Sequence, residues 1–432
     1  MRSRTKPIKP SGMKPASFVR TLWLVAFVAL QARTENFALK DGDRVVFYGD
    51  SITDQRLYTT FAETYVLTRF PKLNVSFVHS GWGGDRVTGG GGGPVDLRLR
   101  RDVIAYKPTV MTVMLGMNDG SYRAFDEKIF DTYAKGYQHI IDSVKAALPG
   151  IRITVIQPSP FDDVTQPPRF EGGYNAVLAR YSQFVKELAG REKLTVADLN
   201  SPVVAALEKA KSTDAELAMK IIPDRVHPGP GGHLLMAAEL LKSWQAPALV
   251  SAVEIDARSK KVAETKKSSV SEMNAGDSVS WTQLDEALPM PVDLNDPVVA
   301  LAVKSSDFLQ ALNQQTLKVT GLGAANFELK IDDEALGSFT KEELAEGINL
   351  ATLPTPMAKQ AAEVHKLTLQ HNSIHFQRWR QIQVPLADSK SPKVQKAVED
   401  LMTALDEEEA TVVKEQRTAA QPRRHQFQLA PK

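Results

Sequence analysis

The amino-acid sequence predicts an α/β protein with a doubly wound parallel sheet, followed by a C-terminal extension of mixed α and β structure. Three observations support this prediction. Short apolar runs of strand length alternate with helical patterns up to about residue 250, an order typical of parallel sheets covered by helices on both faces. From 251 onward the pattern changes to polar stretches and Pro-rich turns. The chain has 432 residues, 43% of them hydrophobic, which is too long for one ordinary core.

Residues 1–34 are predicted to be a secretory signal peptide. Basic residues and no acidic residue precede Glu35, and an apolar core runs from Leu22 to Leu30. This core is shorter than the ~20 residues that span a bilayer, so we expect no stable membrane span. The segment predicts a secreted or periplasmic protein of bacterial type. Because no small-x-small site follows Leu30, cleavage and retention as an interfacial anchor both stay open.

The composition excludes several classes of function. The chain has no cysteine, which excludes disulfides, thiolate catalysis and cysteine-ligated zinc. Its 53 basic and 51 acidic residues are interspersed and leave a net charge of +2, so no nucleic-acid partner is expected. No cofactor is predicted, and the oligomeric state is not indicated.

The first strand of the predicted sheet leads directly to a candidate nucleophile. Val45–Tyr48 is an apolar run without a polar break, as in strands buried on both faces. It ends at Gly49, and a helical pattern follows at 57–67, so Ser51 lies at a strand-to-helix junction. Such junctions are where parallel α/β sheets place their chemistry. Taken alone, Ser51 could also be a plain helix N-cap.

The next two strands end in polar loops of the same kind. A strand at 74–79 leads to Gly84, and a strand at 109–115 leads to Asn118. Because the carboxyl ends of parallel strands share one edge, we expect Gly84, Asn118 and Ser51 to converge there. The alternation then continues with strands at 151–156 and 194–199 and helices at 125–148, 174–188, 203–210 and 234–244.

Asp224 and His227 are predicted to activate the serine. A serine hydroxyl needs a base within hydrogen-bond reach, itself oriented by a carboxylate. The Asp-x-x-His spacing lets Asp224 reach the near ring nitrogen while the far nitrogen faces Ser51. The alternative is a capping Asp beside a structural His. His233 is interpreted as a packing residue at the start of a helix.

Acyl transfer also needs donors aimed at the developing oxyanion. The candidates are the backbone N–H groups of Ser51 and Gly84 and the side-chain amide of Asn118. The alternatives are a plain turn at 81–84 and an Asx-turn at Asn118.

Four ordered blocks between about residues 40 and 250 resemble the SGNH/GDSL hydrolase family. The blocks are Gly49-Asp50-Ser51, Gly84, Gly116-Met117-Asn118-Asp119 and Asp224-Arg225-Val226-His227-Pro228. The resemblance implies a three-layer α/β/α sandwich with a flavodoxin-like sheet over 35–250 and metal-free esterase, lipase or carbohydrate-deacetylating activity. The sequence departs from the family pattern in carrying His79 where Asn is frequent. Because Ser51 does not lie in Gly-x-Ser-x-Gly, the order of blocks differs from that of α/β-hydrolases.

The resulting prediction is an exported serine esterase that deacetylates carbohydrate, small or polymeric, through an acyl-enzyme. Ser51 attacks, His227 transfers the proton, Asp224 orients His227, and Ser51, Gly84 and Asn118 hold the oxyanion. The choice of substrate depends on the resemblance, on export and on the absence of a long apolar lid. The alternatives are a lysophospholipase-like lipid hydrolase, an acyltransferase, and a non-enzymatic carbohydrate-binding or structural protein on the same fold.

Other segments carry weaker signals. The glycine run 89–93 lacks a following Lys-Ser/Thr, which excludes a Walker site and predicts a flexible loop. In the extension, 251–432, we expect a surface loop at 264–271, a hairpin of 317–320 with 326–331, a turn at Asp332, and long helices at 357–384 and 393–419, the latter ending the fold. His371 and His375 are spaced i, i+4 but lack a third ligand, so no metal site is predicted. The extension could be a polysaccharide-binding module, a lid or scaffold.

Overall fold

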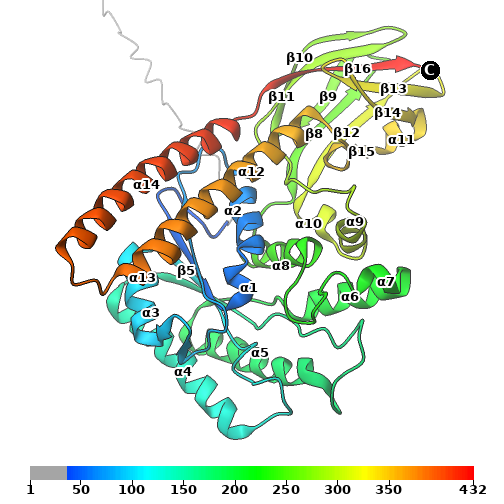
Figure 1. The fold of residues 1–432 in the computed structure, drawn as a ribbon. Coiled ribbons are helices and arrows are strands. Elements are labelled where there is room, and N and C mark those ends of the chain that lie inside the picture. The colour runs from blue at the N-terminus through cyan, green and yellow to red at the C-terminus, as the bar shows by residue number, and fades with distance from the viewer. Residues whose placement is uncertain (1–36) are drawn as a thin grey trace, which may run out of the picture. The chain divides into compact units, whose positions relative to one another are not determined.

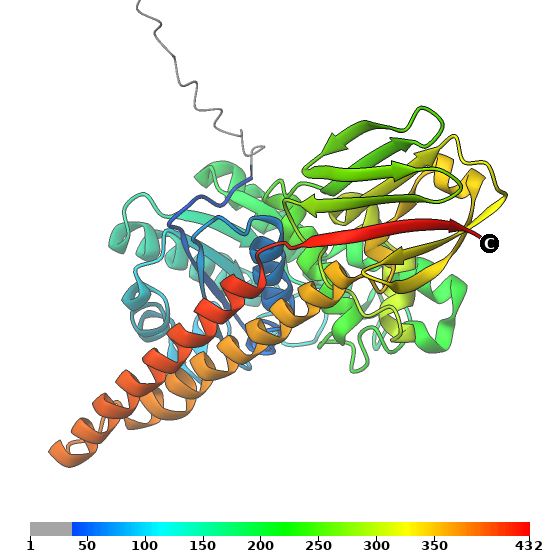
Figure 2. The ribbon, with the colours of Figure 1, turned by 90° about the horizontal axis from the view of Figure 1, so that it is seen from above.

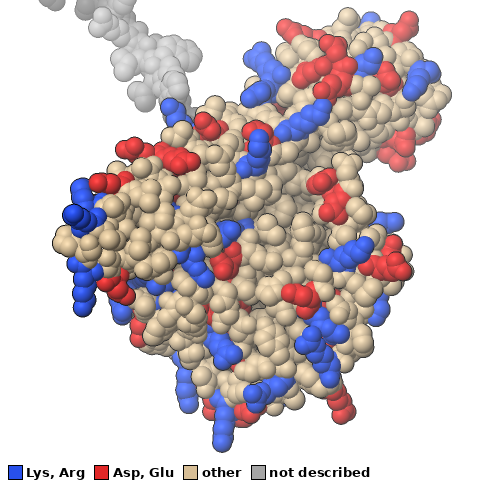
Figure 3. All heavy atoms as spheres, viewed as in Figure 1, with Lys and Arg blue, Asp and Glu red and all other residues tan. Residues whose placement is uncertain are grey.

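The computed structural model describes residues 37–432, so the predicted signal peptide lies outside the described residues. None of the helices in this part of the chain is long and apolar enough to cross a membrane. Acidic and basic side chains are interspersed over the face shown in Figure 3.

A five-stranded parallel sheet forms the centre of the first half of the chain. Its strand order is β2-β1-β5-β6-β7, which is the flavodoxin-like order 2-1-3-4-5. The predicted parallel sheet and its order of elements are therefore confirmed. β1 lies between β2 and β5, so the loops that follow these three strands are neighbours. The strands are β1 Arg44–Gly49, β2 Ser76–Gly81, β5 Val110–Met114, β6 Arg152–Ile156 and β7 Thr195–Ala197.

Helices cover this sheet on both sides, giving three layers (Figure 1). α2 packs against α8, while α4 contacts α3 and α5. The α4 tyrosines Tyr133 and Tyr137 donate hydrogen bonds to β5 and the residue after it, at Leu115 O (3.2 Å) and Val113 O (3.0 Å). The helices are α1 Ser51–Asp54, α2 Leu57–Arg69, α3 Val95–Asp102, η1 Ile104–Tyr106, α4 Glu127–Ala147, α5 Gly173–Glu192, α6 Ser201–Thr213, α7 Ala215–Ala218 and α8 Pro230–Ser243.

The second half contains two further sheets around a second hydrophobic core, which includes Trp281, Phe327 and Leu329. One sheet has the order β15-β12-β8-β9 and the other β10-β11-β16-β13-β14. Alternate residues of β12, β13 and β16 are buried, as expected where one face of a strand packs on a core. The strands are β8 Leu249–Asp256, β9 Lys261–Lys266, β10 Ser268–Ala275, β11 Val279–Asp285, β12 Gln314–Thr320, β13 Asn326–Ile331, β14 Glu334–Thr340, β15 Ile348–Asn349 and β16 Arg424–Pro431.

Three expectations for the extension are wrong. The residues expected as a hairpin form strands β12 and β13, but these lie in different sheets: β12 pairs with β8, and β13 pairs with β14 and β16. The expected surface loop at 264–271 belongs to β9 and β10. The charged helix does not end the fold, because β16 follows it and pairs with both β11 and β13. The turn at Asp332 is confirmed by the β13–β14 pairing.

Residues beyond 250 also contribute to the first core. Met290 belongs to the same buried cluster as α8, and so do residues of α9 Pro297–Lys304 and α10 Phe308–Leu312. The proposed domain boundary at 250/251 stays a prediction. Two short helical segments, α11 Lys341–Glu346 and η2 Leu350–Thr352, complete the connection to the last helices.

Two long antiparallel helices, the helical hairpin (356–419), lie beside α2 (Figures 1 and 2). The long helices predicted here are confirmed. The first, α12 Pro356–Phe376, continues without a break through the π-helical η3 Gln377–Gln383 into α13 Val384–Leu386. The second is α14 Pro392–Ala419. α12 also contacts β2, so the hairpin covers the edge strand of the parallel sheet.

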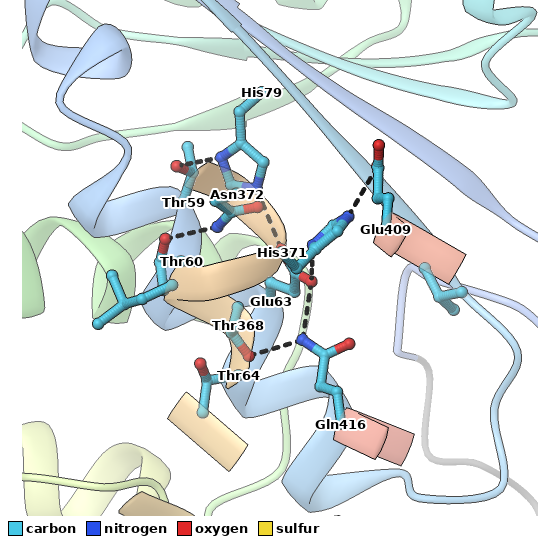
Figure 4. A network of polar contacts seen from close by, with 12 residues as sticks. Thr59, Thr60, Glu63, Thr64, His79, Thr368, His371, Asn372, Glu409 and Gln416 are labelled. Atoms are coloured by element: carbon cyan, nitrogen blue, oxygen red, sulfur yellow. Dashed lines mark hydrogen bonds and ion pairs between the residues drawn. The ribbon is translucent and has the colours of Figure 1, made fainter. Parts of the chain in front are cut away.

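A buried polar network centred on Glu63 of α2 attaches the helical hairpin (Figure 4). One carboxylate oxygen of Glu63 accepts from His79 Nε2 (3.0 Å), and the other accepts from His371 Nδ1 (3.1 Å) and Gln416 Nε2 (3.1 Å). His371 Nε2 donates to Glu409 on α14 (3.2 Å). His79, the residue that departs from the family pattern, therefore belongs to the attachment of the extension.

His371 and His375 have different partners although they are one helical turn apart. His371 belongs to the Glu63 network, whereas the ring of His375 stacks on Trp379 and its Nδ1 accepts from Arg378 (3.3 Å). Burial lowers the pKa of His375 to about 3. Both side chains are buried, and no cluster of metal-ligating side chains is found among residues 37–432.

Candidate active site

Ser51 is held at the carboxyl edge of the sheet by a sharp turn after β1. Asp50 caps α1 by accepting the backbone N–H of Ile52 (3.0 Å). A Cβ at Gly49 would lie 2.2 Å from Thr53 Oγ1 and 2.7 Å from Met114 O, so only glycine fits there. Ser51 is the first residue of α1 and its side chain is half-buried. The predicted strand-to-helix junction is therefore present.

His227 and Asp224 lie within hydrogen-bond distance of each other and of Ser51. His227 Nε2 is 2.8 Å from Ser51 Oγ, and His227 Nδ1 is 2.7 Å from Asp224 Oδ2. The other carboxylate oxygen of Asp224 accepts the backbone N–H groups of Val226 (2.9 Å) and His227 (2.7 Å). In this arrangement a neutral imidazole can accept the Ser51 proton while its second nitrogen donates to Asp224.

The charge on Asp224 is favoured by these contacts. Burial opposes ionisation, but hydrogen bonds from the backbone and ring of His227 lower the pKa of Asp224 below its ordinary value. The carboxylate can therefore stabilise an imidazolium at His227 when a proton arrives there. The loop is also fixed from the side, because Arg225 O accepts the backbone N–H of Asp162 (2.9 Å).

Gly84 presents an exposed backbone donor. Its φ of +76° is a left-handed conformation that favours glycine, and its N–H has no acceptor among residues 37–432. The preceding N–H, of Gly83, donates to Oδ2 of Asp54, the last residue of α1 (3.1 Å). The loop after β2 is thus connected to the turn that carries Ser51.

The side chain of Asn118 joins two loops. Its amide nitrogen donates to the carbonyl of Asp85 (3.0 Å), the residue after Gly84, and its oxygen accepts from the Tyr122 hydroxyl (2.9 Å). Neither contact is the side-chain bond to its own backbone that an Asx-turn requires. One of its two amide hydrogens remains for another acceptor.

An open cleft of about 490 Å³ lies over Ser51 and His227. Arg56 and Phe376 line it, and the sequence analysis did not identify either residue. The Arg56 guanidinium carbon is 4.1 Å from the centroid of the Phe376 ring. Phe376 comes from the last turn of α12, so the extension forms part of the cleft wall. The remaining lining residues are Asp54, Gln55 and Asp224.

Two other expectations near the site have clear outcomes. His233 packs in the first turn of α8 as predicted: it is fully buried, and its Nε2 bonds to Gln55 Oε1 (2.9 Å). The glycine run, expected as a flexible loop, instead forms a short antiparallel pair of β3 Gly89–Gly90 and β4 Gly93–Pro94. Gly92 lies between these strands and packs against Arg98 and Trp82.

Comparisons with known proteins match different parts of the chain. Residues 47–235 match the model of the GDSL-like Lipase/Acylhydrolase family. An acetylxylan esterase from Geobacillus stearothermophilus is 26% identical over 225 residues, which cover 46% of this chain and 93% of that protein. The solved structure of a gut microbial diltiazem-metabolizing enzyme is 27% identical, with a TM-score of 0.78, and covers 92% of this chain and 100% of that chain. The match to the diltiazem-metabolizing enzyme therefore includes the extension.

Proposed function

Because residues 47–235 form a domain of the GDSL-like lipase/acylhydrolase family and the chain is an ester-hydrolysing enzyme, we propose that it deacetylates carbohydrate through an acyl-enzyme at Ser51. The observation that carries the proposal is the pair of contacts from His227, 2.8 Å to Ser51 Oγ and 2.7 Å to Asp224 Oδ2. This geometry supplies a nucleophile, a base and an orienting carboxylate in one line.

In the first half-reaction Ser51 Oγ attacks the acetyl carbonyl carbon while its proton moves to His227 Nε2. The oxyanion accepts hydrogen bonds from the backbone N–H groups of Ser51 and Gly84 and from the free N–H of the Asn118 amide. The C–O bond to the sugar then breaks, and His227 gives its proton to the departing sugar oxygen. In the second half-reaction His227 takes a proton from a water molecule as its oxygen attacks the acetyl carbon. The bond from this carbon to Ser51 Oγ then breaks, His227 returns the proton to Ser51 Oγ, and acetate is released.

The chemistry of the cleft favours a polar substrate with a short acyl group. Asp54, Gln55 and Arg56 offer hydrogen-bonding groups to sugar hydroxyls. Phe376 is the one apolar side chain among the described residues that line the cleft, whereas a long acyl chain needs an extended apolar surface. The likeness to an acetylxylan esterase supports the same choice. A lysophospholipase-like activity is therefore the less favoured alternative.

The test compares acetylated xylo-oligosaccharides, diltiazem as a soluble acetate ester, and nitrophenyl esters of increasing chain length. We expect acetate release from the sugars and a kcat/KM that falls as the acyl chain lengthens. Ser51→Ala should reduce kcat by ~10⁴-fold or more, and a fluorophosphonate should label the Ser51 peptide of the wild type alone. A kcat/KM that rises towards long acyl chains contradicts the proposal and favours the lipid hydrolase. Acetylation of an added sugar in place of acetate release favours the acyltransferase.

We also propose that the protein is exported, as secreted or periplasmic enzyme. The basic start and the apolar core Leu22–Leu30 support this proposal. Expression of the full chain in bacteria, followed by cell fractionation and N-terminal sequencing, tests it. An enzyme recovered in the cytoplasm with residues 1–34 intact would contradict the proposal.

A further inference from the structure

We propose that the helical hairpin takes part in catalysis: Trp379 positions the loop that carries Gly84, acting through Asp102, Arg98 and Asp85. This inference rests on the proposed function, because it takes the Gly84 N–H as a donor to the oxyanion. It assigns a role in the reaction to the extension, which lies outside the segment matched by the family. Trp379 is a positioning residue in this proposal and does not touch the substrate.

The first step is the contact between the hairpin and the parallel-sheet domain. Trp379 lies in η3, directly after the turn of α12 that lines the cleft, and only 1% of its side chain is exposed. Its indole N–H donates to Asp102 Oδ1 at 2.6 Å. Its ring packs edge-on against Trp82, with the ring centroids 5.7 Å apart. π-Helical turns of this kind are rare and occur frequently at functional sites.

The second step is a buried ion-pair chain. The other oxygen of Asp102 binds Arg98, whose Nε donates to Asp85 Oδ2 at 2.7 Å. A further nitrogen of Arg98 donates to Ser80 O at 2.8 Å. Asp102, Arg98 and Asp85 are all fully buried. Arg101 Nε also donates to Asp102 Oδ1 at 2.7 Å, so this oxygen is shared between Arg101 and Trp379. Because a buried charge is strongly destabilised when it loses a partner, a shift of Asp102 is expected to shift Arg98 and, through it, Asp85.

The third step connects Asp85 to the proposed oxyanion donors. Asp85 follows Gly84 directly, so the position of its carboxylate constrains the Gly84 N–H. The Asp85 carbonyl also accepts the Asn118 amide at 3.0 Å, which places the second donor relative to the first. A displacement of ~1 Å at a reacting group can reduce the rate by ~10²-fold.

The glycine run, 89–93, packs against the side chains of Arg98 and Trp82. A Cβ on Gly92 would lie 2.5 Å from Arg98 Cδ and 2.7 Å from Trp82 Cδ2, so the backbone packs directly on these side chains. Trp82 N donates to Gly49 O at 2.9 Å, immediately before the Ser51 turn. The loop is therefore clamped between β1, the glycine run and Trp379.

Attachment of the hairpin does not depend on Trp379. The Glu63 network holds α12 and α14 to α2 (Figure 4), and Asn372 Nδ2 adds a bond to Thr60 Oγ1 at 2.7 Å. A variant that loses only the indole donor is therefore expected to fold. This separates a positioning role from a purely structural one.

The experiment compares Trp379→Phe with the matched control Trp281→Phe. Trp281 is also fully buried and donates its indole N–H to Gln283 Oε1 at 3.0 Å, but it lies in the second core. Both variants lose one indole hydrogen bond and the same volume, so both should lower Tm. Trp379→Phe alone should lower kcat on an acetate ester by ~10- to 100-fold with KM within about twofold of wild type.

Two further measurements test whether Trp379 acts through the loop that carries Gly84. Affinity for a trifluoromethyl ketone, which forms a tetrahedral adduct with the serine, should fall by the same factor as kcat/KM. In an Asn118→Ala background the Trp379→Phe effect on kcat should shrink, because both substitutions act on the Asp85 loop. If Trp379→Phe does not fold, Asp102→Asn is measured in its place. This substitution weakens the ion-pair chain at the residue that Trp379 contacts, and we expect the same reduction in kcat.

Equal kcat in the folded fractions of Trp379→Phe and Trp281→Phe, with an active wild type, overturns this inference and leaves the proposed function standing. A wild type that is inactive on every ester and unlabelled at Ser51 overturns the proposed function and this inference with it.

Discussion

Asp224 binds two backbone N–H groups with one carboxylate oxygen and the His227 ring with the other. At the scale of single residues, one oxygen of Asp224 therefore holds the backbone of the loop, and the other orients the His227 ring. An amide in place of the carboxylate can keep the backbone contacts through its oxygen, but its nitrogen cannot accept from His227.

We therefore predict that Asp224→Asn lowers kcat by ~10²- to 10⁴-fold with a small change in Tm. Because contacts from His227 hold the pKa of Asp224 below its ordinary value, the wild-type carboxylate stays charged at neutral and mildly acidic pH. The fall of the wild-type rate at acidic pH then reports the protonation of a group other than Asp224. The measurement is kcat/KM against pH for both proteins, and an unchanged profile with unchanged kcat would remove Asp224 from the mechanism.

Asn118 gives a second prediction at this scale. A donor to the oxyanion acts only as charge develops, so Asn118→Ala should lower kcat by ~10²- to 10³-fold and leave KM nearly unchanged. Loss of the bond to Asp85 should also lower stability by ~1 kcal/mol. Steady-state kinetics and thermal unfolding of one purified variant separate the two effects. A destabilised variant with wild-type kcat would leave Asn118 a purely structural role.

Residues with local signals could be predicted from the sequence, and residues without them could not. The Asp-x-x-His spacing and the Gly-Asp-Ser turn predicted which side chains would meet, and the structure brings them together. Phe376 enters the cleft from a helix far along the chain, with no motif to indicate it. The departure at His79 is explained only when Glu63 and its partners on the hairpin are known.

At the scale of elements, the buried contacts of α12 and α14 make their attachment depend on pH. Burial disfavours the charge on His371, yet the Glu63 and Glu409 carboxylates raise its pKa to about 10. Glu63 is itself buried, but His371 and His79 lower its pKa, so it stays charged in the same range. Burial lowers the pKa of His79, so its ring is neutral when the pH is above the ordinary pKa of a histidine.

The pKa of His371 leads to a prediction about stability. Its contribution is complete below the unfolded-state pKa of ~6.5 and disappears as the pH rises from there to about 10. The urea midpoint of the wild type should therefore fall between pH 6.5 and 10, and His371→Gln should reduce that fall. Equilibrium unfolding at several pH values provides the measurement. Parallel curves for the two proteins would show that His371 stays neutral in the fold.

Elements were predicted where sequence pattern and environment agree. The absence of Gly and Pro predicted the long helix from 357, and two runs of strand length separated by the turn glycines Gly321 and Gly323 predicted β12 and β13. β9 was missed because its residues are all exposed, so no apolar pattern marks it as a strand. The β12–β13 hairpin was wrong because a short loop indicates neighbours in sequence but not which sheet each strand joins.

At the scale of the whole molecule, the two halves share buried surface. Residues around Met290 and the helices α9 and α10 complete the first core, and the helical hairpin covers the edge at β2. The parallel sheet and its order were predictable from the first 250 residues, because each strand and helix there has its own local pattern. The docking of the extension was not, since it depends on contacts such as Glu63 to His371 between distant segments.

We predict that a fragment ending at Val250 does not fold to an active enzyme, because apolar surface in its core would be left uncovered. The chain through Lys432 should instead unfold in one transition that removes secondary structure and esterase activity together. Circular dichroism and activity during urea titration test both statements. A soluble fragment of 37–250 with wild-type kcat would contradict this prediction and also the positioning role of Trp379.

The central place of β16 in its sheet has a consequence for how the protein is made. β16 lies between β11 and β13, although both of those strands leave the ribosome before it. Until residues 424–431 emerge, β10–β11 and β13–β14 are two separate ribbons, each with an open edge able to pair with another chain. The sheet can therefore close only after synthesis has passed α14, and the newly made protein is most prone to aggregation in that interval.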